Sequence, residues 1–337
     1  MDRLGGWCQA LVLLLSRRDV ESILSMEDAI QAVEGAFKQF ALGKVTMPMR
    51  TNVTLESYRG QFLTMPGYVG GEVEGLGLKV VTVYPENPSR GLPTILATIQ
   101  LNNPRTGELL AIMDGAYITA VRTGAVSGVA TKHLSRKGSS VVGLFGAGVQ
   151  AEKQLEAVCC VRPIAKVKVF DPLVNLREKF CSEASRKLGV DVVSVSSPMD
   201  AVVGCEMLIT ATTSKTPVFS GRWVEAGAHI NAIGAHTSDA RELDDDVARK
   251  AKIVVDSRET ALREAGDLII PIKAGIIGEE NIHAELGEIL VGSKLGRETD
   301  REITLFKSVG LALQDVSTAT LVYRKAVERN VGVNMDF

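Results

Sequence analysis

The feature that constrains this chain most is a glycine-rich turn between an apolar run and a helical run. Residues 139–158 read SSVVGLFGAGVQAEKQLEAV, with Gly146 and Gly148 two positions apart in the turn. The apolar run at 141–145 predicts a buried strand, and the periodic residues after the turn predict a helix. A strand that enters a helix in this way is typical of a parallel sheet covered by helices.

The turn has the composition of a dinucleotide phosphate site. Gly146 would allow the tight turn, Gly148 would let a pyrophosphate approach the main chain, and Ala151 would keep the helix close to the strand. The helix N-terminus would offer free N–H groups and its positive dipole end to the phosphates. The alternative is a glycine turn in an α/β domain without a cofactor. The turn residues assigned to cofactor binding are Gly146, Ala147, Gly148, Val149 and Gln150.

An acidic residue stands where such a site needs one. The next predicted strand, KVKVFD, ends in Asp171, about 20 residues after the turn. A carboxylate there can accept hydrogen bonds from the adenosine ribose hydroxyls, and it would repel a 2′-phosphate. Asp171 therefore favours NAD(H) over NADP(H), although the same side chain could instead cap the next helix.

The rest of the second half alternates between strand-like and helix-like runs. Strands are predicted at 140–145, 166–170, 191–195, 207–212, 229–234 and 252–256, and helices at 175–189 and 242–251. The alternation predicts an α/β fold with helices on both faces of a parallel sheet. Ligands bind such sheets at the carboxyl ends of strands, so two further turns are assigned to cofactor binding, although either could be a plain loop. Their residues are Thr210, Ala211, Thr212, Ile233 and Gly234.

The first half follows a different pattern. Between residues 50 and 113, short apolar runs are separated by Gly, Pro and Asn. This pattern predicts a mostly antiparallel sheet, with the apolar run at 10–15 as a further strand. Ser25 is the expected N-cap of the first long helix. Helices are predicted at 25–43, 116–135 and 310–330.

Composition excludes several classes of function. The 337 residues are 45% hydrophobic, which allows a large core and about two domains. A net charge of −2 argues against nucleic acid or a membrane surface as partner. The cysteine count is odd and no CxxC occurs, which indicates reduced thiols and a cytoplasmic protein. No HExxH, Cys–His cluster, GxSxG or Walker lysine occurs, so neither a metal nor a hydrolase site is predicted.

Three cations of the first half have apolar or small neighbours: Arg50 in MPMRTNV, Lys79 in GLGLKVVTV and Arg122 in AVRTGAV. A charge in an apolar strand is costly unless it is paired. A guanidinium can form two parallel hydrogen bonds to a carboxylate. Together they suggest a small anionic substrate, although each could instead form an ion pair with a protein carboxylate or have a solvated tip.

With these pieces in place, the sequence resembles the ornithine cyclodeaminase/μ-crystallin family over nearly its whole length. The matching phrases are GLPTILATIQLNNPRTGELLAIMDGAYITAVRTGA, GAGVQA, INAIGAHTSDARELD and VGLALQDVSTA. The resemblance implies a homodimer whose subunits have a Rossmann domain (129–304) and a second α+β domain built from both chain ends (10–128 and 305–337). That second domain would make the dimer contact and supply the substrate pocket.

The resemblance also implies roles for individual residues. Arg50, Lys79 and Arg122 would bind the substrate carboxylate, and Met65 would line the same pocket. The cofactor phosphates would contact Thr123 and Gly124, and the turn that begins at Gly310 would lie near the nicotinamide.

Two departures from the family pattern bear on the reaction. Ornithine cyclodeaminases carry an aspartate where this sequence has His236, and a glutamate where it has Leu63 and Thr64. Asp239 could stand in for the first of these acids, but it lies three residues later. Both losses argue against ornithine cyclisation.

Of the family's reactions, reduction of a preformed cyclic imine needs the fewest acid–base groups. The leading hypothesis is NADH-dependent reduction of Δ1-pyrroline-2-carboxylate, and of its six-membered homologue Δ1-piperideine-2-carboxylate, to the cyclic amino acid. Lys79 and His236 are the candidate catalytic residues, because His236 could relay a proton if it is more than a pocket-lining side chain. The alternatives are an alanine dehydrogenase, an ornithine cyclodeaminase and a non-catalytic ligand-binding protein.

Overall fold

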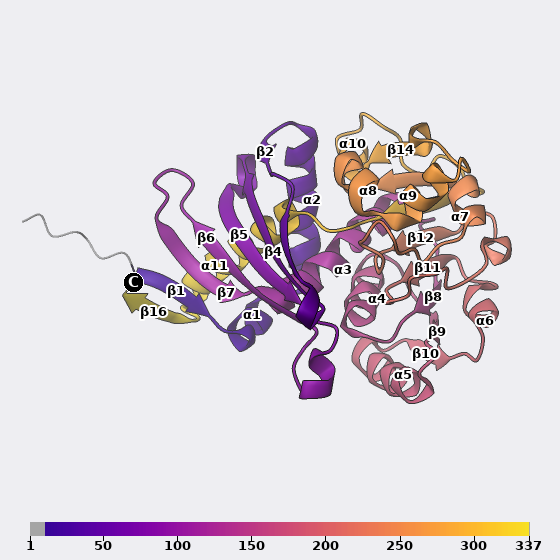
Figure 1. The fold of residues 1–337 in the computed structure, drawn as a ribbon, viewed down its shortest axis with the longest axis horizontal. Helices are drawn as coiled ribbons and strands as arrows, with labels where there is room; N and C mark the ends of the chain where they lie inside the picture. Colours follow the sequence, from indigo (N-terminus) through magenta and orange to yellow (C-terminus); the bar gives the residue numbers. More distant parts are fainter. Residues whose placement is uncertain (1–10, 337) are drawn as a thin grey trace, which may run out of the picture. The chain divides into compact units, whose positions relative to one another are not determined.

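The computed structural model describes residues 11–336, and the extension predicted for residues 1–9 lies outside them. The chain divides into two compact units (Figure 1). Among the described residues, the first unit combines 11–119 with 312–336, and the second spans 120–311. Both chain ends therefore contribute to the first unit. No helix of the described residues is long and apolar enough to cross a membrane.

The first unit is built on a mixed sheet in the order β16-β1-β7-β6-β5-β4-β2, with β3 paired to β4. Neighbouring strands are antiparallel except for β1 and β7, which are parallel. The strands are β1 Leu11–Leu15, β2 Val45–Thr46, β3 Thr51–Leu55, β4 Gly60–Val69, β5 Gly75–Val83, β6 Ile95–Asn102, β7 Leu109–Asp114 and β16 Val333–Asp336. Short 3-10 turns lie at Glu56–Tyr58, Gly71–Val73 and Asn87–Arg90.

Helices cover one face of this sheet. Helix α11 (Ala312–Arg329) packs on β4, β5 and β6. Helix α2 (Met26–Ala41) packs on α11, and α1 (Arg17–Ile23) contacts both α11 and β7. Ser25 caps α2 as predicted, since its side chain accepts a hydrogen bond from the main-chain N–H of Asp28. Lys325 of α11 forms an ion pair with Asp28 and so ties the two helices together.

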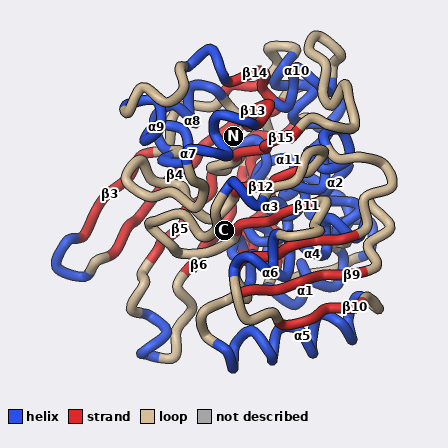
Figure 2. Tube along the Cα trace, turned by 90° about the vertical axis from the view of Figure 1, so that its right-hand side faces the viewer, coloured by secondary structure: helices blue, strands red, loops and turns tan. Residues whose placement is uncertain are grey.

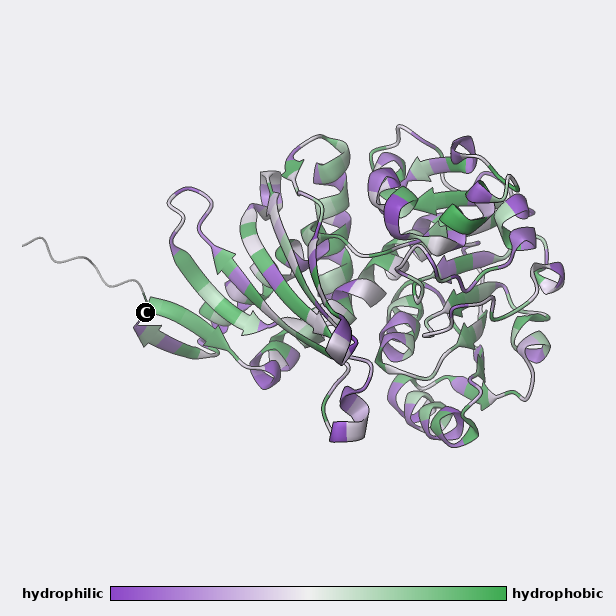
Figure 3. Ribbon diagram, in the orientation of Figure 1, coloured by the Kyte–Doolittle hydropathy of each residue, from purple (hydrophilic) through white to green (hydrophobic). Residues whose placement is uncertain are grey.

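Residues of β4 and β5 alternate between this covered face and the opposite one. Leu63, Met65 and Val81 are buried and pack with Ala312 of α11. Phe62, by contrast, points to the face without helices, where it is 39% exposed. Figure 3 shows both hydrophobic and hydrophilic residues along the strands of this sheet.

The second unit is a parallel sheet in the order β10-β9-β8-β11-β12-β15-β13-β14 (Figure 2). The strands are β8 Val141–Phe145, β9 Lys166–Phe170, β10 Asp191–Ser194, β11 Met207–Thr210, β12 His229–Ala232, β13 Ala251–Val255, β14 Ile282–Glu285 and β15 Ile303–Lys307. The helices are α4 Val149–Val161, α5 Val174–Leu188, α6 Pro198–Val202, α7 Asp245–Lys250, α8 Arg258–Glu264, α9 Gly266–Lys273 and α10 Leu286–Leu290, with 3-10 turns at Gly221–Trp223 and Glu279–Asn281. Helix α3 (Gly115–Leu134) crosses the boundary between the units.

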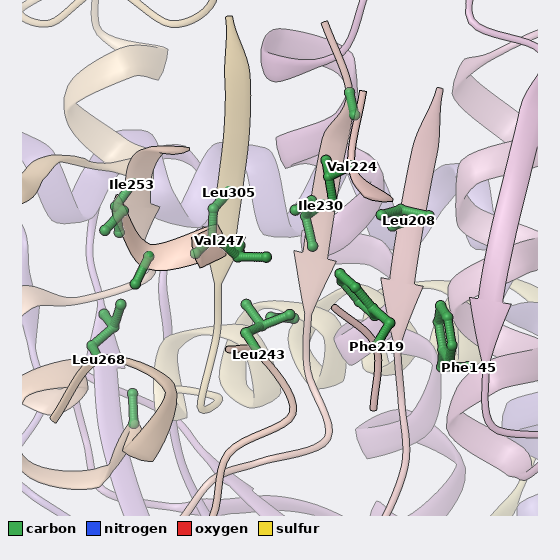
Figure 4. Close-up of a cluster of buried hydrophobic side chains, with 14 of the residues drawn as sticks. Phe145, Leu208, Phe219, Val224, Ile230, Leu243, Val247, Ile253, Leu268 and Leu305 are labelled. Atoms are coloured by element: carbon green, nitrogen blue, oxygen red, sulfur yellow. The ribbon is translucent and has the colours of Figure 1, made fainter. Parts of the chain in front are cut away.

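Both faces of this second sheet are buried. In β11, Met207 and Ile209 belong to one apolar cluster, whereas Leu208 between them belongs to the other. Figure 4 shows the second cluster, in which Leu208 and Phe219 pack beside Phe145. The central strand order, with β8 flanked by β9 and β11, is that of a Rossmann fold, as predicted.

All the strands predicted in the second half are present, and so are the long helices. Five strands were not predicted individually, namely β2, β3, β14, β15 and β16. Of these, β15 is inserted between β12 and β13, out of chain order.

Candidate functional site

The glycine turn has the conformation that a phosphate site needs. Gly146 has φ +103°, and a Cβ there would lie 2.5 Å from the carbonyl oxygen of Ala211, so only glycine fits. Gly148 is the N-cap of α4, and a Cβ built on it would meet no atom within 4 Å. The helix N-terminus therefore opens on unfilled space beside an unsubstituted main chain, which fits a phosphate group.

Helix α3 is attached to the helix that follows this turn. The side-chain amide of Gln154 in α4 donates to the carbonyl oxygen of Thr123, with an N–O distance of 2.8 Å. Both residues are buried. Thr123, assigned to the cofactor, is thus held against α4.

Asp171 lies directly after β9, at the carboxyl edge of the sheet. One of its carboxylate oxygens accepts a hydrogen bond from the main-chain N–H of Leu173 at 2.9 Å. Leu173 is the N-cap of α5, so Asp171 shapes the entry to that helix. Asp171 is therefore not the helix cap that the sequence left open, although it accepts from the N–H of the N-cap residue.

The two loops after β11 and β12 are joined by Glu242, a residue that the sequence did not single out. Its carboxylate accepts hydrogen bonds from the hydroxyl of Thr210 (2.8 Å) and from the main-chain N–H of Gly234 (2.7 Å). The main-chain N–H and the hydroxyl of Thr212 each donate to it at 2.7 Å. The hydroxyls of Thr210 and Thr212, two threonines assigned to the cofactor, thus donate to this carboxylate and are left with acceptor sites only.

Glu242 is part of a buried charged group. Burial, with the nearby Asp267 carboxylate, raises the pKa of Glu242. Asp267 accepts from the main-chain N–H of Glu242 (2.7 Å) and forms an ion pair of 2.7 Å with Lys307. Lys307 in turn donates to the carbonyl oxygen of Ala235, in the loop after β12.

A second buried carboxylate shapes the turn that contains Gly310. Asp256 accepts hydrogen bonds from the hydroxyl of Ser308 (2.7 Å) and from the main-chain N–H groups of Val309 (2.8 Å) and Gly310 (3.0 Å). Gly310 has φ +83°, and a Cβ there would lie 2.7 Å from a guanidinium nitrogen of Arg122. The structure thus brings Gly310 and the buried Arg122 together.

Lys79 occupies the covered face of the first unit's sheet. Its ammonium nitrogen lies 2.7 Å from a carboxylate oxygen of Asp315 in α11, and both side chains are buried. Met65 is its cross-strand neighbour in β4, so Met65 and Lys79 share this face. The ion pair with a protein carboxylate that the sequence left open for Lys79 is therefore formed. Arg50 is half-buried in the segment between β2 and β3.

The remaining predicted residues lie on the loop after β12. Ile233 is buried, and its main-chain N–H donates to the carbonyl oxygen of Thr210 at 3.0 Å. His236 is exposed, and its Nδ1 donates to the carbonyl oxygen of Gly234 at 3.0 Å. Asp239 accepts from the hydroxyl of Thr237 (2.7 Å), which together with its own main-chain N–H lowers the pKa of this carboxyl.

The sequence analysis did not identify three buried carboxylates of the site, Asp315, Glu242 and Asp256. Only Asp315 carries a signal, because it is an acid in a run of small and apolar residues. Glu242 stands in the acidic segment ELDDD, which looks like a solvated helix start, and Asp256 looks like a strand end. Among residues 11–336, no group of three or more His, Cys, Asp or Glu side chains could hold a metal ion.

Among curated proteins, the chain is 44% identical over 325 residues to an alanine dehydrogenase of Archaeoglobus fulgidus, covering 96% of this chain and 98% of the relative. It is 39% identical over 327 residues to a Delta(1)-pyrroline-2-carboxylate reductase of Bacillus cereus, covering 97% and 100%. The substrates in these names differ, although both names denote oxidoreductases.

Two solved structures are closely similar. A Delta(1)-pyrroline-2-carboxylate reductase of Thermococcus litoralis, in complex with NADH and L-proline, is 52% identical with a TM-score of 0.94, covering 96% of this chain and 100% of that chain. An archaeal alanine dehydrogenase dimer with bound NAD is 44% identical with a TM-score of 0.91, covering 97% and 99%. The model of the ornithine cyclodeaminase/mu-crystallin family matches residues 11–330. This chain belongs to the ornithine cyclodeaminase/mu-crystallin family.

Proposed function

We propose that this protein is an NAD(H)-dependent oxidoreductase that reduces Δ1-pyrroline-2-carboxylate to L-proline, and that Δ1-piperideine-2-carboxylate can replace it. The observation that carries the proposal is the Thermococcus litoralis relative, which is 52% identical over its whole length and holds both NADH and L-proline. The residues present here fit the same pair of ligands: an open glycine turn for the phosphates and basic side chains for a carboxylate.

The cofactor would be held by the second unit. The turn from Gly146 to Gln150 would bind the phosphates, joined by Thr123, and Asp171 would bind the adenosine ribose. The two loops joined by Glu242 and the turn at Gly310 would line the rest of the crevice. NADH supplies the hydride that reduces the imine carbon.

The substrate carboxylate would be bound by Arg50, Lys79 and Arg122. Lys79 is suited to this role because its ammonium group is a cation with N–H donors, the kind of group that forms charge-assisted hydrogen bonds with a carboxylate. Fixing the ring in one orientation can lower the barrier by several kcal/mol, roughly 7 at best. The ring nitrogen takes up one proton, for which Lys79 and the exposed His236 are the proposed donors.

Alanine dehydrogenation is the second candidate, because the Archaeoglobus fulgidus relative of that name is 44% identical. That reaction adds water to an imine and needs a positioned base. Asp239 is a poor candidate for this base, since its lowered pKa leaves it a weaker proton acceptor than an ordinary carboxylate. Reduction of a preformed imine remains the first candidate, because the relative that holds NADH and L-proline is 52% identical, against 44% for the alanine dehydrogenase.

We also propose that the functional unit is a homodimer joined through the uncovered face of the first unit's sheet. Val53, Phe62, Thr82 and Leu96 are successive cross-strand partners, so they form one row on that face. The three apolar members of the row are each at least 37% exposed, and a second copy of the chain would bury them. The cytoplasm is the proposed compartment, as the free thiols of residues 11–336 suggest.

A substrate panel tests the activity. Purified protein with NADH should consume Δ1-pyrroline-2-carboxylate and form L-proline, monitored by NADH absorbance and by product analysis. Reductive amination of pyruvate without imine reduction would identify an alanine dehydrogenase. Release of ammonia and proline from ornithine would identify a cyclodeaminase, and inactivity on every imine and oxoacid would indicate a binding protein.

A further inference from the structure

The buried carboxylate of Glu242 links the loops after β11 and β12. One carboxylate oxygen accepts the two bonds from Thr212, and the other accepts those from Thr210, Gly234 and, at 3.2 Å, the main-chain N–H of Ala235. Because β11 and β12 are adjacent parallel strands, both loops leave the sheet at its carboxyl edge. One buried side chain thus fixes the spacing of two loops at the edge where ligands bind.

The five donors require a carboxylate at this place. An ionised carboxylate only accepts hydrogen bonds, whereas a carboxamide presents an NH₂ group on one side. A glutamine at position 242 would therefore point two N–H bonds at N–H or O–H donors of one loop. Burying such unsatisfied groups costs free energy, so the loop would move away.

The Glu242 carboxylate and the two loops are closely packed. A Cβ on Gly234 would lie 2.3 Å from the carbonyl oxygen of Thr212 and 2.4 Å from a carboxylate oxygen of Glu242. Asp267, which accepts from the main-chain N–H of Glu242, is itself fixed by Lys307. The position of Glu242 is therefore fixed by Asp267 and Lys307 as well as by the two loops.

We infer that Glu242 is a positioning residue for NAD(H): it acts through the loops at Thr210–Thr212 and Ile233–Ala235 and sets the affinity for the dinucleotide without contacting it. The inference rests on the proposed assignment of these loops to cofactor binding. It predicts that neutralising Glu242 weakens dinucleotide binding by more than it weakens the fold.

The test is the dissociation constant for NADH, measured on the full chain without substrate by fluorescence titration, together with the melting temperature. Glu242→Gln is expected to raise this constant at least tenfold. The matched control is Glu206→Gln, because Glu206 also accepts from main-chain N–H groups, those of Ser140 (2.7 Å) and Val141 (3.2 Å), but at the amino edge of the same sheet. This control should lower the melting temperature and leave the constant within twofold of wild type.

A folded Glu242→Gln variant that binds NADH as tightly as wild type would overturn the inference. Equal weakening by Glu206→Gln would also overturn it, since the effect would then come from general loss of stability. If Glu242→Gln does not fold, Thr210→Val removes one of the five bonds and should raise the constant about fivefold, and no change would count against the inference. Because no substrate is present, failure of the proposed imine reduction would leave these results unaffected.

Discussion

The sheets of the two units bury their charged residues in different ways. In the first unit, Lys79 lies in the middle of a strand, where neighbouring strands already use the main-chain groups. Its charge is therefore compensated by a side chain, Asp315. In the second unit, Asp256 directly after β13 and Glu242 in the loop after β12 accept from main-chain N–H groups of loops. The second unit also contains a buried ion pair, between Asp267 and Lys307, so compensation by the main chain is specific to Glu242 and Asp256.

This difference has a consequence for ligands. An ammonium group is a cation with N–H donors and can attract an anion, whereas a carboxylate saturated by N–H donors cannot bind anything more. Lys79 of the first unit is therefore suited to the substrate contact that we propose. In the second unit, Glu242 and Asp256 shape loops instead.

The largest expected effect comes from removing the buried charge of Lys79 in the first unit. Lys79→Met should lower kcat/KM for Δ1-pyrroline-2-carboxylate about a thousandfold, roughly 4 kcal/mol, because a desolvated charge contact to the carboxylate is lost. The dissociation constant for NADH should stay within threefold of wild type, as the proposed cofactor residues belong to the second unit.

Lys38→Met is the control for this change, since Lys38 is an exposed lysine of the same unit, paired with Glu34. It should leave both quantities unchanged. Loss of NADH binding in Lys79→Met would mean that Lys79 is needed for the fold, and unchanged turnover would remove it from the substrate site.

The two sheets also differ in coverage, and a charge on the uncovered face tests the proposed dimer. Phe62→Asp should weaken self-association about a hundredfold, because a carboxylate would be buried against an apolar row. Sedimentation at several protein concentrations measures the change. Val203→Asp places the same charge on an exposed apolar site of the second unit and should leave the dimer intact. A Phe62→Asp variant that remains dimeric would place the interface elsewhere.

A structural feature can be predicted from the sequence when the residues that determine it are consecutive in the chain. The turn at Gly146 is local, because strand, glycines and helix are consecutive, and both the turn and its conformation were predicted. The insertion of β15 between β12 and β13 depends on pairing across distant segments, and a five-residue strand has too little periodicity to reveal it. Asp315, the partner of Lys79, is also distant in sequence, and Thr210 and Thr212 lie 32 and 30 residues before Glu242. The sequence could therefore suggest that a buried charge matters but not which residue compensates it.

An effect of intermediate size is expected from a histidine on the pH dependence of stability. All four histidines lie in the second unit. Burial, with the nearby Arg297, lowers the pKa of His229 to about 3. Below its ordinary pKa of about 6.5, this histidine gains a proton in the unfolded chain but not in the folded one, so stability falls as the pH falls. Between pH 7.5 and 5 the free energy of unfolding should decrease by about 2 kcal/mol on this account.

Urea unfolding at several pH values measures this decrease. His229→Gln should remove most of the slope, even though it lowers stability at neutral pH by disturbing the contact with Thr304. His283→Gln, on the partly exposed β14, should keep the slope. An unchanged slope in His229→Gln would assign the acid sensitivity to other groups.

The smallest expected effect separates two roles of one side chain. Asp171 accepts from the N–H of Leu173 and, by our proposal, also binds the adenosine ribose. Asp171→Asn keeps an acceptor for Leu173 but removes the charge that would repel a 2′-phosphate. The ratio of NADPH to NADH affinity should therefore rise about tenfold, near 1.4 kcal/mol, while the melting temperature stays constant.

Asp171→Ala removes both functions and should also lower the melting temperature, because the entry to α5 loses its side-chain acceptor. If Asn leaves the affinity ratio unchanged and Ala lowers only stability, Asp171 would be a helix-entry residue and nothing more. A preference for NADH over NADPH would then have to come from a different residue of the second unit. A change in the ratio with Asn alone would instead show that one oxygen of this carboxylate shapes the main chain while the charge selects the ligand.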